Sequence, residues 1–292
     1  MNVLGSTRVL GVFGHPISHS LSPVMHNAAI RALNIDYIYV PFHVLPEKLG
    51  SAIEGVRALG IAGVNLTIPH KERVIGFLDE VDDHALAIRS VNTVINEAGR
   101  LRGCSTDGPG FIKSAEAAWG KIDRCRALIL GAGGSAKAVG FALAGIGCEI
   151  VVANRTFERA VDLVDSLKLV LSRVEGAESS SPRAVRLESE ALAEEIERAD
   201  LLVNTTSVGM HPDADGIPLP PDLIRPGLLV YDLVYNPLRT RLIQEAESRG
   251  AKAVNGLKML VYQGALSFET WTGVEPPVDV MEQAALRSLL AG

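Results

Sequence analysis

A glycine-rich turn between an apolar strand and a helix is the feature that most constrains how this chain can fold. The strand is expected over 127–130, the turn reads Gly131-Ala-Gly-Gly-Ser-Ala136, and the helix is expected over 135–145. A second β-type run over 148–153 completes a βαβ unit. Glycines in such a turn let the backbone approach a pyrophosphate closely, and the helix N-terminus offers free N–H groups. The sequence therefore predicts a Rossmann-type dinucleotide-binding unit.

The end of the second strand indicates which dinucleotide is bound. An NAD-binding chain usually places Asp or Glu there, to accept a hydrogen bond from the ribose 2′-hydroxyl. Residues 151–157 contain no acid, whereas Asn154-Arg155-Thr156 supplies Arg155, and Arg159 follows four residues later. A guanidinium can pair bidentately with a phosphate. We therefore predict NADP(H) as the cofactor; the alternative is that Arg155 is an ordinary solvated arginine after a strand.

Composition narrows the class of protein further. A chain of 292 residues with 47% apolar residues predicts two well-buried domains. The net charge of -6 argues against nucleic acid as a partner. Three widely spaced cysteines without a CxxC motif or a His/Cys cluster indicate a reducing compartment and no metal site. No secretory leader or membrane-spanning run is evident, so we expect a cytoplasmic protein without membrane contact.

Strand and helix patterns alternate along both halves. This alternation predicts an α/β fold with two α/β domains around a cleft, the second a Rossmann-type dinucleotide-binding domain. The polar, serine-rich segment 174–190 is expected to be an insertion or a long surface loop. Further strands are expected over 8–13, 37–43, 63–68, 92–96, 101–104, 201–204 and 228–232, and further helices over 23–33, 46–59, 71–78, 83–88, 108–119, 191–198, 240–249, 259–271 and 278–290.

Polar side chains gather at strand ends in the first half. Ser20 and Ser22 precede a helix, where hydroxyl and free N–H groups can hold a carboxylate; the alternative is that Ser22 simply caps the helix. Asn65 and Thr67 alternate with apolar residues at the end of a strand and are expected on one polar face. Open α/β sheets bind ligands at the carboxyl ends of their strands, so these four residues are candidate ligand groups.

Lys71 and Asp107 are candidate proton carriers. Lys71 is expected to open a helix after the Asn65 strand, and Asp107 lies among small residues just before the helix expected over 108–119. An ammonium group facing a carboxylate across a cleft could move a proton to or from a substrate hydroxyl. The simpler interpretations are a solvated lysine and a helix-capping aspartate.

Taken together, these motifs resemble those of the shikimate dehydrogenase family, over about residues 9–273. The motifs are Gly14-His-Pro-Ile-Ser-His-Ser-Leu-Ser-Pro23, Asn65-Leu-Thr-Ile-Pro-His-Lys71, Val91-Asn-Thr93, Thr106-Asp-Gly108, Gly131–Ala136, Asn154–Thr156, Asn204-Thr-Thr-Ser-Val-Gly-Met210, Asp232-Leu-Val-Tyr-Asn-Pro237 and Gly256-Leu-Lys-Met-Leu-Val-Tyr-Gln263. The resemblance implies NADP-dependent, reversible reduction of 3-dehydroshikimate to shikimate. It also implies a substrate-binding domain of residues 1–107 with 257–292, an NADP-binding domain of residues 108–256, and a homodimer.

The resemblance also implies roles for individual residues. Lys71 and Asp107 would be the catalytic pair. The substrate would be held by Ser20, Ser22, Asn65, Thr67, Asn92, Tyr235 and Gln263. The cofactor would contact Gly131, Ala132, Gly133, Gly134, Ser135, Ala136, Asn154, Arg155, Thr156, Arg159, Thr205, Ser207, Met210, Leu233, Gly256 and Met259.

Three other functions share part of this pattern. A quinate/shikimate dehydrogenase that uses NAD would carry nearly every motif, and Arg155 without a neighbouring acid argues against it. A folate-linked methylene dehydrogenase also combines a lysine with a dinucleotide fold but does not need the two serines. A non-catalytic NADP-binding sensor would not need both Lys71 and Asp107.

Overall fold

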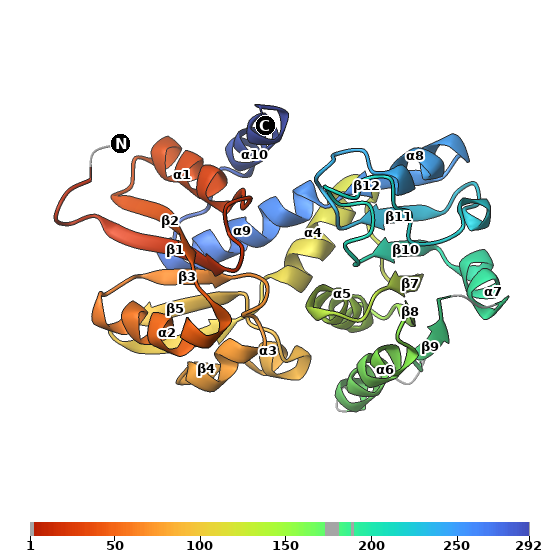
Figure 1. Cartoon of the computed structure of the whole chain (residues 1–292), viewed down its shortest axis with the longest axis horizontal. Coiled ribbons are helices and arrows are strands. Elements are labelled where there is room, and N and C mark those ends of the chain that lie inside the picture. The colour runs from red at the N-terminus through yellow and green to blue at the C-terminus, as the bar shows by residue number, and fades with distance from the viewer. Residues whose placement is uncertain (1–2, 173–180, 188–189, 292) are drawn as a thin grey trace. The chain divides into compact units, whose positions relative to one another are not determined.

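The computed structural model describes residues 3–172, 181–187 and 190–291, which form two compact units. The first unit combines Met1–Gly110 with Leu260–Gly292, and the second is Phe111–Met259. The limits of the units fall inside two helices, α4 (Asp107–Trp119) and α9 (Leu257–Thr272). In the described part of the chain, each unit contains one six-stranded sheet (Figure 1).

The sheet of the first unit has the strand order β2-β1-β3-β5-β6-β4. Its strands are β1 (Arg8–Gly14), β2 (Tyr37–His43), β3 (Gly63–Leu66), β4 (Glu80–Val81), β5 (Thr93–Glu97) and β6 (Arg100–Cys104). β1 pairs in parallel with β2 and β3, whereas β5 runs antiparallel to both β3 and β6. Ala98 and Gly99 between β5 and β6 both have positive φ angles, 54° and 93°, as a two-residue hairpin turn requires. This hairpin joins the two strands that the sequence predicts over 92–96 and 101–104.

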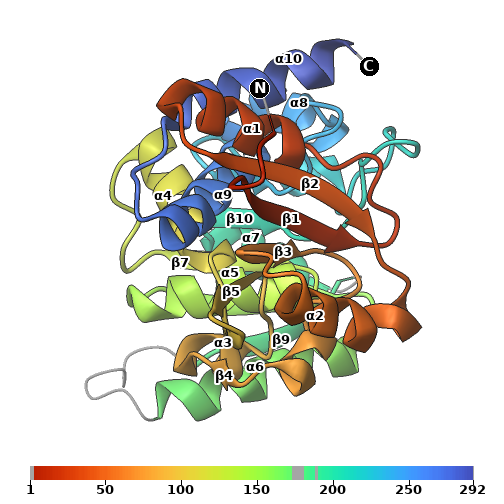
Figure 2. The same cartoon turned by 90° about the vertical axis from the view of Figure 1, so that its left-hand side faces the viewer.

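Helices cover this first sheet. They are α1 (Ser22–Leu33), α2 (Leu49–Ala58), α3 (Asp83–Ile88) and α10 (Val278–Ala291), with the 3₁₀ helices η1 (Pro46–Lys48) and η2 (Arg73–Phe77). The apolar residues Leu49, Ile53 and Val56 of α2 recur at helical spacing and pack with the sheet residues Val64 and Leu101. α1 and α10 lie side by side in both views (Figures 1 and 2).

The sheet of the second unit is parallel throughout its described strands, in the order β12-β11-β10-β7-β8-β9. Its strands are β7 (Arg126–Leu130), β8 (Glu149–Asn154), β9 (Arg183–Arg186), β10 (Leu201–Asn204), β11 (Leu229–Asp232) and β12 (Lys252–Asn255). Counted within the unit, this is the order 3-2-1-4-5-6 of the dinucleotide-binding fold. The predicted α/β fold with a Rossmann-type second unit is confirmed.

Helices connect the strands of the second unit. They are α5 (Gly134–Gly145), α6 (Phe157–Leu171), α7 (Glu190–Arg198) and α8 (Arg241–Ser248), with the 3₁₀ helix η3 (Pro221–Leu223). β7, β8 and β10 are almost continuously apolar, because a parallel sheet is covered on both faces. Leu192 and Ile196 of α7 and Leu242 of α8 pack against this sheet.

Two expectations about elements were wrong. The helix expected over 71–78 is the five-residue 3₁₀ helix η2, so Lys71 lies before it rather than inside an α-helix. Within the expected 174–190 loop, β9 (Arg183–Arg186) pairs in parallel with β8 and extends the sheet. Its four residues are too few to be recognised in the sequence as a strand within a polar segment. Residues 174–180 and 188–189 of the expected loop lie outside the described residues. Among the helices of the described ranges, none is both long enough and apolar enough to cross a membrane.

Candidate active site

Lys71 and Asp107 meet in the first unit, although 36 residues separate them in sequence. Lys71 lies just before η2, and Asp107 is the first residue of α4. Lys71 Nζ donates to Asp107 Oδ2 at 2.6 Å. The Asp107 side chain is 7% exposed and the Lys71 side chain 21%, so the carboxylate is enclosed and the ammonium group stays accessible. An ion pair that is held by a buried carboxylate and still reaches solvent can exchange a proton with a bound molecule.

Asn92 connects this pair to two other polar side chains. Its Nδ2 lies 2.8 Å from Asp107 Oδ1, 2.9 Å from Thr106 Oγ1 and 3.1 Å from Gln263 Oε1. An amide nitrogen has only two protons to donate, so these three acceptors compete for them. Asn92 Oδ1 accepts from the backbone N–H of Thr106 at 2.8 Å, which fixes the orientation of the amide.

Hydrogen bonds to neighbouring buried residues hold the Asn65 side chain in place. Tyr39 donates its hydroxyl proton to Asn65 Oδ1 at 2.7 Å, and Asn65 Nδ2 donates to the carbonyl of Asn92 at 3.0 Å and to Ser267 Oγ at 3.1 Å. A carbonyl can only accept, so this contact identifies the amide nitrogen. Burial raises the pKa of Tyr39 well above its usual range, which keeps its hydroxyl a neutral donor.

The two serines that are expected to bind a carboxylate, Ser20 and Ser22, lie at the start of α1. Ser22 is the first residue of the helix and Leu21 occupies the cap position, so the expected capping by Ser22 was wrong. The helix starts one residue early because the chain already turns at Ser20, whose N–H donates to the carbonyl of Ile17. Ser20 Oγ accepts from the backbone N–H of Ser22 at 3.3 Å, and the Ser22 hydroxyl pairs with Tyr39.

Two predicted substrate residues stand outside this network. Thr67 lies just beyond β3 and is half-buried, and among the described residues no hydrogen bond joins its hydroxyl to the others. Tyr235 follows β11 in the second unit, where burial raises its pKa. Because Tyr235 and the serines belong to different units, the approach of Tyr235 to Ser20 and Ser22 stays a prediction.

The glycine-rich turn between β7 and α5 has the backbone that the sequence predicted. Gly131 has a φ angle of +109°, and a Cβ there would lie 2.5 Å from Thr205 Oγ1. Thr205 Oγ1 in turn donates to the carbonyl of Leu130 at 2.7 Å. Gly133 caps α5 without any side-chain hydrogen bond to the first turn, and no atom lies within 4 Å of its Cβ position. The first N–H groups of α5 are thus open to an anion such as a pyrophosphate.

The arginines after β8 are exposed. Arg155 and Arg159 flank the start of α6, and neither forms an ion pair within the described ranges. By contrast, Arg126 and Arg183 near the other end of β8 both pair with Glu149, at 2.7 Å and 3.0 Å. Arginines that lie at the carboxyl end of a strand and have no acidic partner there are suited to bind a phosphate.

A buried carboxylate organises the neighbouring strand ends. Asp232 at the end of β11 accepts from Asn204 Nδ2 at 2.9 Å and from Thr240 Oγ1 at 2.6 Å. Burial raises the pKa of Asp232 despite these donors. Asn204 ends β10 and Thr240 caps α8, so one carboxylate fixes the ends of two strands and the start of a helix.

The remaining residues predicted to contact the cofactor follow these same strand ends. Thr205, Ser207 and Met210 follow β10, and Leu233 follows β11. Gly256 follows β12, and a Cβ there would lie 2.0 Å from the carbonyl oxygen of Leu233, so only glycine lets the two segments meet. Met259, three residues later in α9, is 8% exposed.

Sequence reasoning overlooked Tyr39 and Ser267, and it assigned no role to Asp232. Ser267 lies four residues after Gln263 on α9, a spacing that places two side chains on one face of a helix and could have revealed it. Tyr39 belongs to an aromatic strand whose pattern indicates only a core position. Its contact with Asn65 joins β2 to β3, and no local sequence pattern predicts a contact between residues so far apart in the chain.

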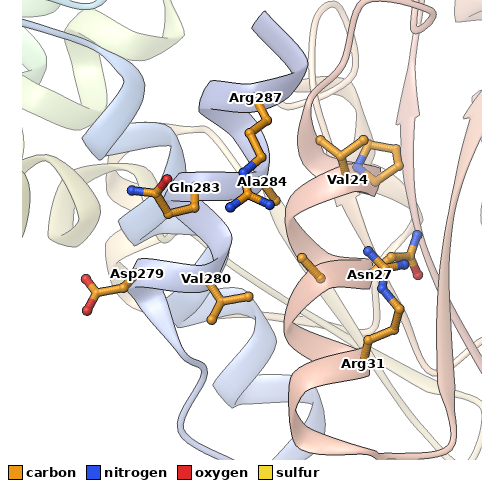
Figure 3. A pocket seen from close by; sticks show the side chains of 10 residues that line it. Val24, Asn27, Arg31, Asp279, Val280, Gln283, Ala284 and Arg287 are labelled. Carbon is orange, nitrogen blue, oxygen red and sulfur yellow. The ribbon is translucent and has the colours of Figure 1, made fainter. Parts of the chain in front are cut away.

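A groove of about 660 Å³ lies between α1 and α10 (Figure 3). Val24, Ala28, Val280 and Ala284 supply its apolar lining, and Arg31 and Arg287 contribute charge. None of the predicted site residues lines it. The groove is therefore separate from the Lys71 network.

Three family models match successive parts of the chain. They describe a shikimate dehydrogenase substrate binding domain over residues 12–94, a shikimate/quinate 5-dehydrogenase over residues 113–209 and a shikimate 5′-dehydrogenase C-terminal domain over residues 256–286. A curated relative from Moorella thermoacetica, named shikimate dehydrogenase (NADP(+)), is 49% identical over 97% of this chain and 94% of its own length.

Solved structures agree with these matches. A crystal structure of a shikimate dehydrogenase in complex with NADP⁺ superposes with a TM-score of 0.92, at 40% identity, and covers 99% of this chain and 98% of the other. The shikimate 5-dehydrogenase of Thermus thermophilus, solved with NADP(H) and shikimate, gives a TM-score of 0.86 at 41% identity and covers 97% of this chain and 100% of the other. The chain therefore belongs to the shikimate dehydrogenase family.

Proposed function

We propose that this protein is an enzyme that catalyses the NADP-dependent, reversible reduction of 3-dehydroshikimate to shikimate, as part of the biosynthesis of aromatic amino acids. Its membership of the family and the names of its relatives support the reaction and the cofactor. The observation that carries the proposal is the contact between Lys71 Nζ and Asp107 Oδ2 at 2.6 Å. It places a proton donor and its carboxylate partner among the amides and hydroxyls that would bind a polyol.

The second unit provides the groups that would hold NADP. The open N–H groups of the 131–136 turn suit the pyrophosphate, and the exposed Arg155 and Arg159 suit the adenosine 2′-phosphate. Asn154 Nδ2 donates to the carbonyl of Thr156 at 2.8 Å and shapes the turn that presents Arg155. When bound, the nicotinamide supplies the hydride chemistry. We assign residues 108–256 to this cofactor-binding role.

The first unit provides the groups that would hold the substrate, and we assign residues 1–107 with 257–292 to this role. Ser20 and Ser22 would bind the carboxylate, with Tyr235 nearby. Asn65, Thr67, Asn92 and Gln263 would bind the ring hydroxyls and the carbonyl. A site built from buried donors and acceptors rejects analogues that lack a hydroxyl, because its own groups would stay unpaired.

Lys71 and Asp107 would handle the proton. During reduction, negative charge develops on the C3 oxygen of the substrate, and the Lys71 ammonium would stabilise this charge and donate a proton. Asp107 would hold the Lys71 side chain through Oδ2, while Asn92 fixes Oδ1. General acid catalysis of this kind contributes about 10²–10⁴-fold to the rate.

A direct assay tests the proposed reaction. We expect the purified protein, when mixed with shikimate and NADP⁺, to form NADPH at a steady rate that is followed by its absorbance. A non-catalytic NADP-binding sensor would bind the dinucleotide in a fluorescence titration without any rise in NADPH absorbance. Binding without turnover would therefore overturn the proposal.

The same assay separates the related substrate and cofactor pairs. We expect shikimate with NADP⁺ to be turned over faster than quinate with NAD⁺, because no acid accompanies Arg155 at the end of β8. Faster oxidation of quinate with NAD⁺ would identify the alternative quinate/shikimate dehydrogenase.

We also propose a cytoplasmic location and a homodimer. The three cysteines are free, which fits a reducing compartment. Val24 and Val280, each 38% exposed at the groove between α1 and α10, offer apolar surface that could support self-association. Light scattering of the purified protein measures its mass directly, and a monomer at micromolar concentration would exclude a stable dimer.

A further inference from the structure

Two cysteines lie side by side at the amino-terminal ends of neighbouring strands. Cys125 precedes β7 and Cys148 precedes β8, and the register of the two strands pairs Arg126 with Glu149. The cysteines therefore occupy opposed positions one step earlier, and the N–H of Glu149 donates to the carbonyl of Cys125 at 2.9 Å. Neighbouring strands lie about 4.8 Å apart, which falls within the Cα separation of disulfide-bonded cysteines.

The two sulfur atoms are already in contact, 3.2 Å apart. Cys148 is buried and its thiol donates to the carbonyl of Ile122 at 3.3 Å, whereas Cys125 is partly exposed. When Cys148 loses its proton, its thiolate accepts a hydrogen bond from the Cys125 thiol, which lowers the pKa of Cys148 and raises that of Cys125. A small reagent thus reaches Cys125 first, with a base directly behind it.

We propose that Cys125 and Cys148 are a modification site that forms an internal disulfide by exchange with low-molecular-weight disulfides such as oxidised glutathione. After Cys148 has released its proton to solvent, Cys125 attacks one sulfur of the reagent while its own proton passes to the Cys148 thiolate, and one glutathione thiolate leaves. That thiolate removes the proton from Cys148. Cys148 then attacks the Cys125 sulfur, the Cys125–Cys148 bond forms, and the second glutathione thiolate leaves. Two protein sulfurs are oxidised and one reagent disulfide is reduced, so two electrons are exchanged.

The bond would close a segment that contains β7, the glycine-rich turn and α5. The cysteines are 23 residues apart, and a cross-link of this span removes conformational entropy from the unfolded chain. They lie at the amino-terminal ends of the parallel strands, whereas the glycine-rich turn lies at the carboxyl ends. We therefore expect the disulfide to stabilise the second unit without altering the turn.

The experiment treats the folded, reduced protein with oxidised glutathione, quenches it with acid, and counts free thiols after denaturation and alkylation. We expect one free thiol of the three to remain, at Cys104, together with a cross-linked peptide that joins residues 125 and 148. The melting temperature should rise by about 5–10 °C and return to its starting value after reduction by dithiothreitol.

Variants provide matched controls. Cys104 lies in the first unit, where burial raises its pKa to about 11, so Cys104→Ser should still form the disulfide. Cys125→Ser and Cys148→Ser should form no internal disulfide and show no reversible gain in melting temperature. Three free thiols after treatment, a persistent mixed disulfide with glutathione in the wild type, or a cross-link to Cys104 would each overturn the proposal.

Discussion

Tyr39 occupies a buried position between two side chains that we assign to substrate binding. Its hydroxyl donates to Asn65 Oδ1 and pairs with the Ser22 hydroxyl, so it sets the orientation of both. We predict that Tyr39→Phe raises KM for shikimate about 2- to 10-fold with a smaller effect on kcat, because the neutral hydrogen bonds to Asn65 and Ser22 are both lost. Steady-state kinetics measure both constants.

Tyr37 provides the control, because it lies on the same strand and its hydroxyl accepts only from Arg8 at the surface among the described residues. Tyr37→Phe should leave KM unchanged. An equal rise of KM in both variants would show that the loss of a strand hydroxyl, rather than the positioning of Asn65, is responsible.

Arg155 and Arg159 are predicted to recognise the 2′-phosphate. Replacing both with glutamine should raise KM for NADP⁺ about 10- to 100-fold, because hydrogen bonds to a charged group are lost. KM for NAD⁺, which has no 2′-phosphate, should change little in the same variant. Parallel increases for the two cofactors would remove both arginines from phosphate recognition.

The turn between β7 and α5 depends on glycine at one position. Gly131→Ala should lower the free energy of unfolding by at least about 1–2 kcal/mol and weaken NADP⁺ binding, because φ is +109° and the new Cβ would meet Thr205 Oγ1. Gly145 at the end of α5 has open space at its Cβ position, so Gly145→Ala should be neutral or slightly stabilising. Denaturant titration and cofactor titration measure both effects; an unaffected Gly131→Ala would show that the turn tolerates a side chain.

α1 carries a buried histidine that stays neutral. The His26 ring stacks on Tyr39 at 4.1 Å, neither ring nitrogen has a hydrogen-bond partner among the described residues, and burial lowers the pKa of His26 to about 3. Below pH 6.5 the unfolded chain binds a proton at this residue and the folded chain does not, so stability falls as the pH falls from 6.5 towards 3.

His26→Phe keeps the stacking and removes the titration. The free energy of unfolding of the variant minus that of wild type should be about 1.4 kcal/mol larger at pH 5.5 than at pH 7.5. Denaturant titrations of both proteins at the two pH values measure this difference. If it were the same at both pH values, His26 would not be excluded from protonation in the folded state.

The elements differ in how well the sequence predicts them. The β7–α5–β8 unit can be predicted from the sequence because its strands are apolar, its turn needs glycine, and its three elements follow one another directly in the chain. β9 cannot be predicted from the sequence, because its four residues at the edge of the sheet carry no strand pattern of their own. They form a strand because they pair with β8. The expected capping of α1 by Ser22 was wrong because a turn at Ser20, rather than the identity of the capping residue, decides where α1 begins.

For the whole molecule, the sequence predicts two α/β units and a set of candidate catalytic residues, but not the contacts that hold those residues. Lys71 and Asp107 stand out by their motifs, and their contact requires the fold. The supporting residues Tyr39 and Ser267 could not be predicted in the same way, because they act through pairs that lie far apart in sequence. The proposed reaction needs both units, because the second would hold NADP and Lys71 of the first would donate the proton.

The most direct test of this account is the initial rate of NADPH formation from shikimate and NADP⁺, measured side by side for wild type and Lys71→Ala. We predict steady turnover by wild type and a kcat lower by about 10²–10⁴-fold in the variant, with KM for shikimate little changed. Lys113→Ala, which removes an exposed lysine of α4, should match wild type. An unchanged kcat in Lys71→Ala, or no turnover by wild type, would contradict the account.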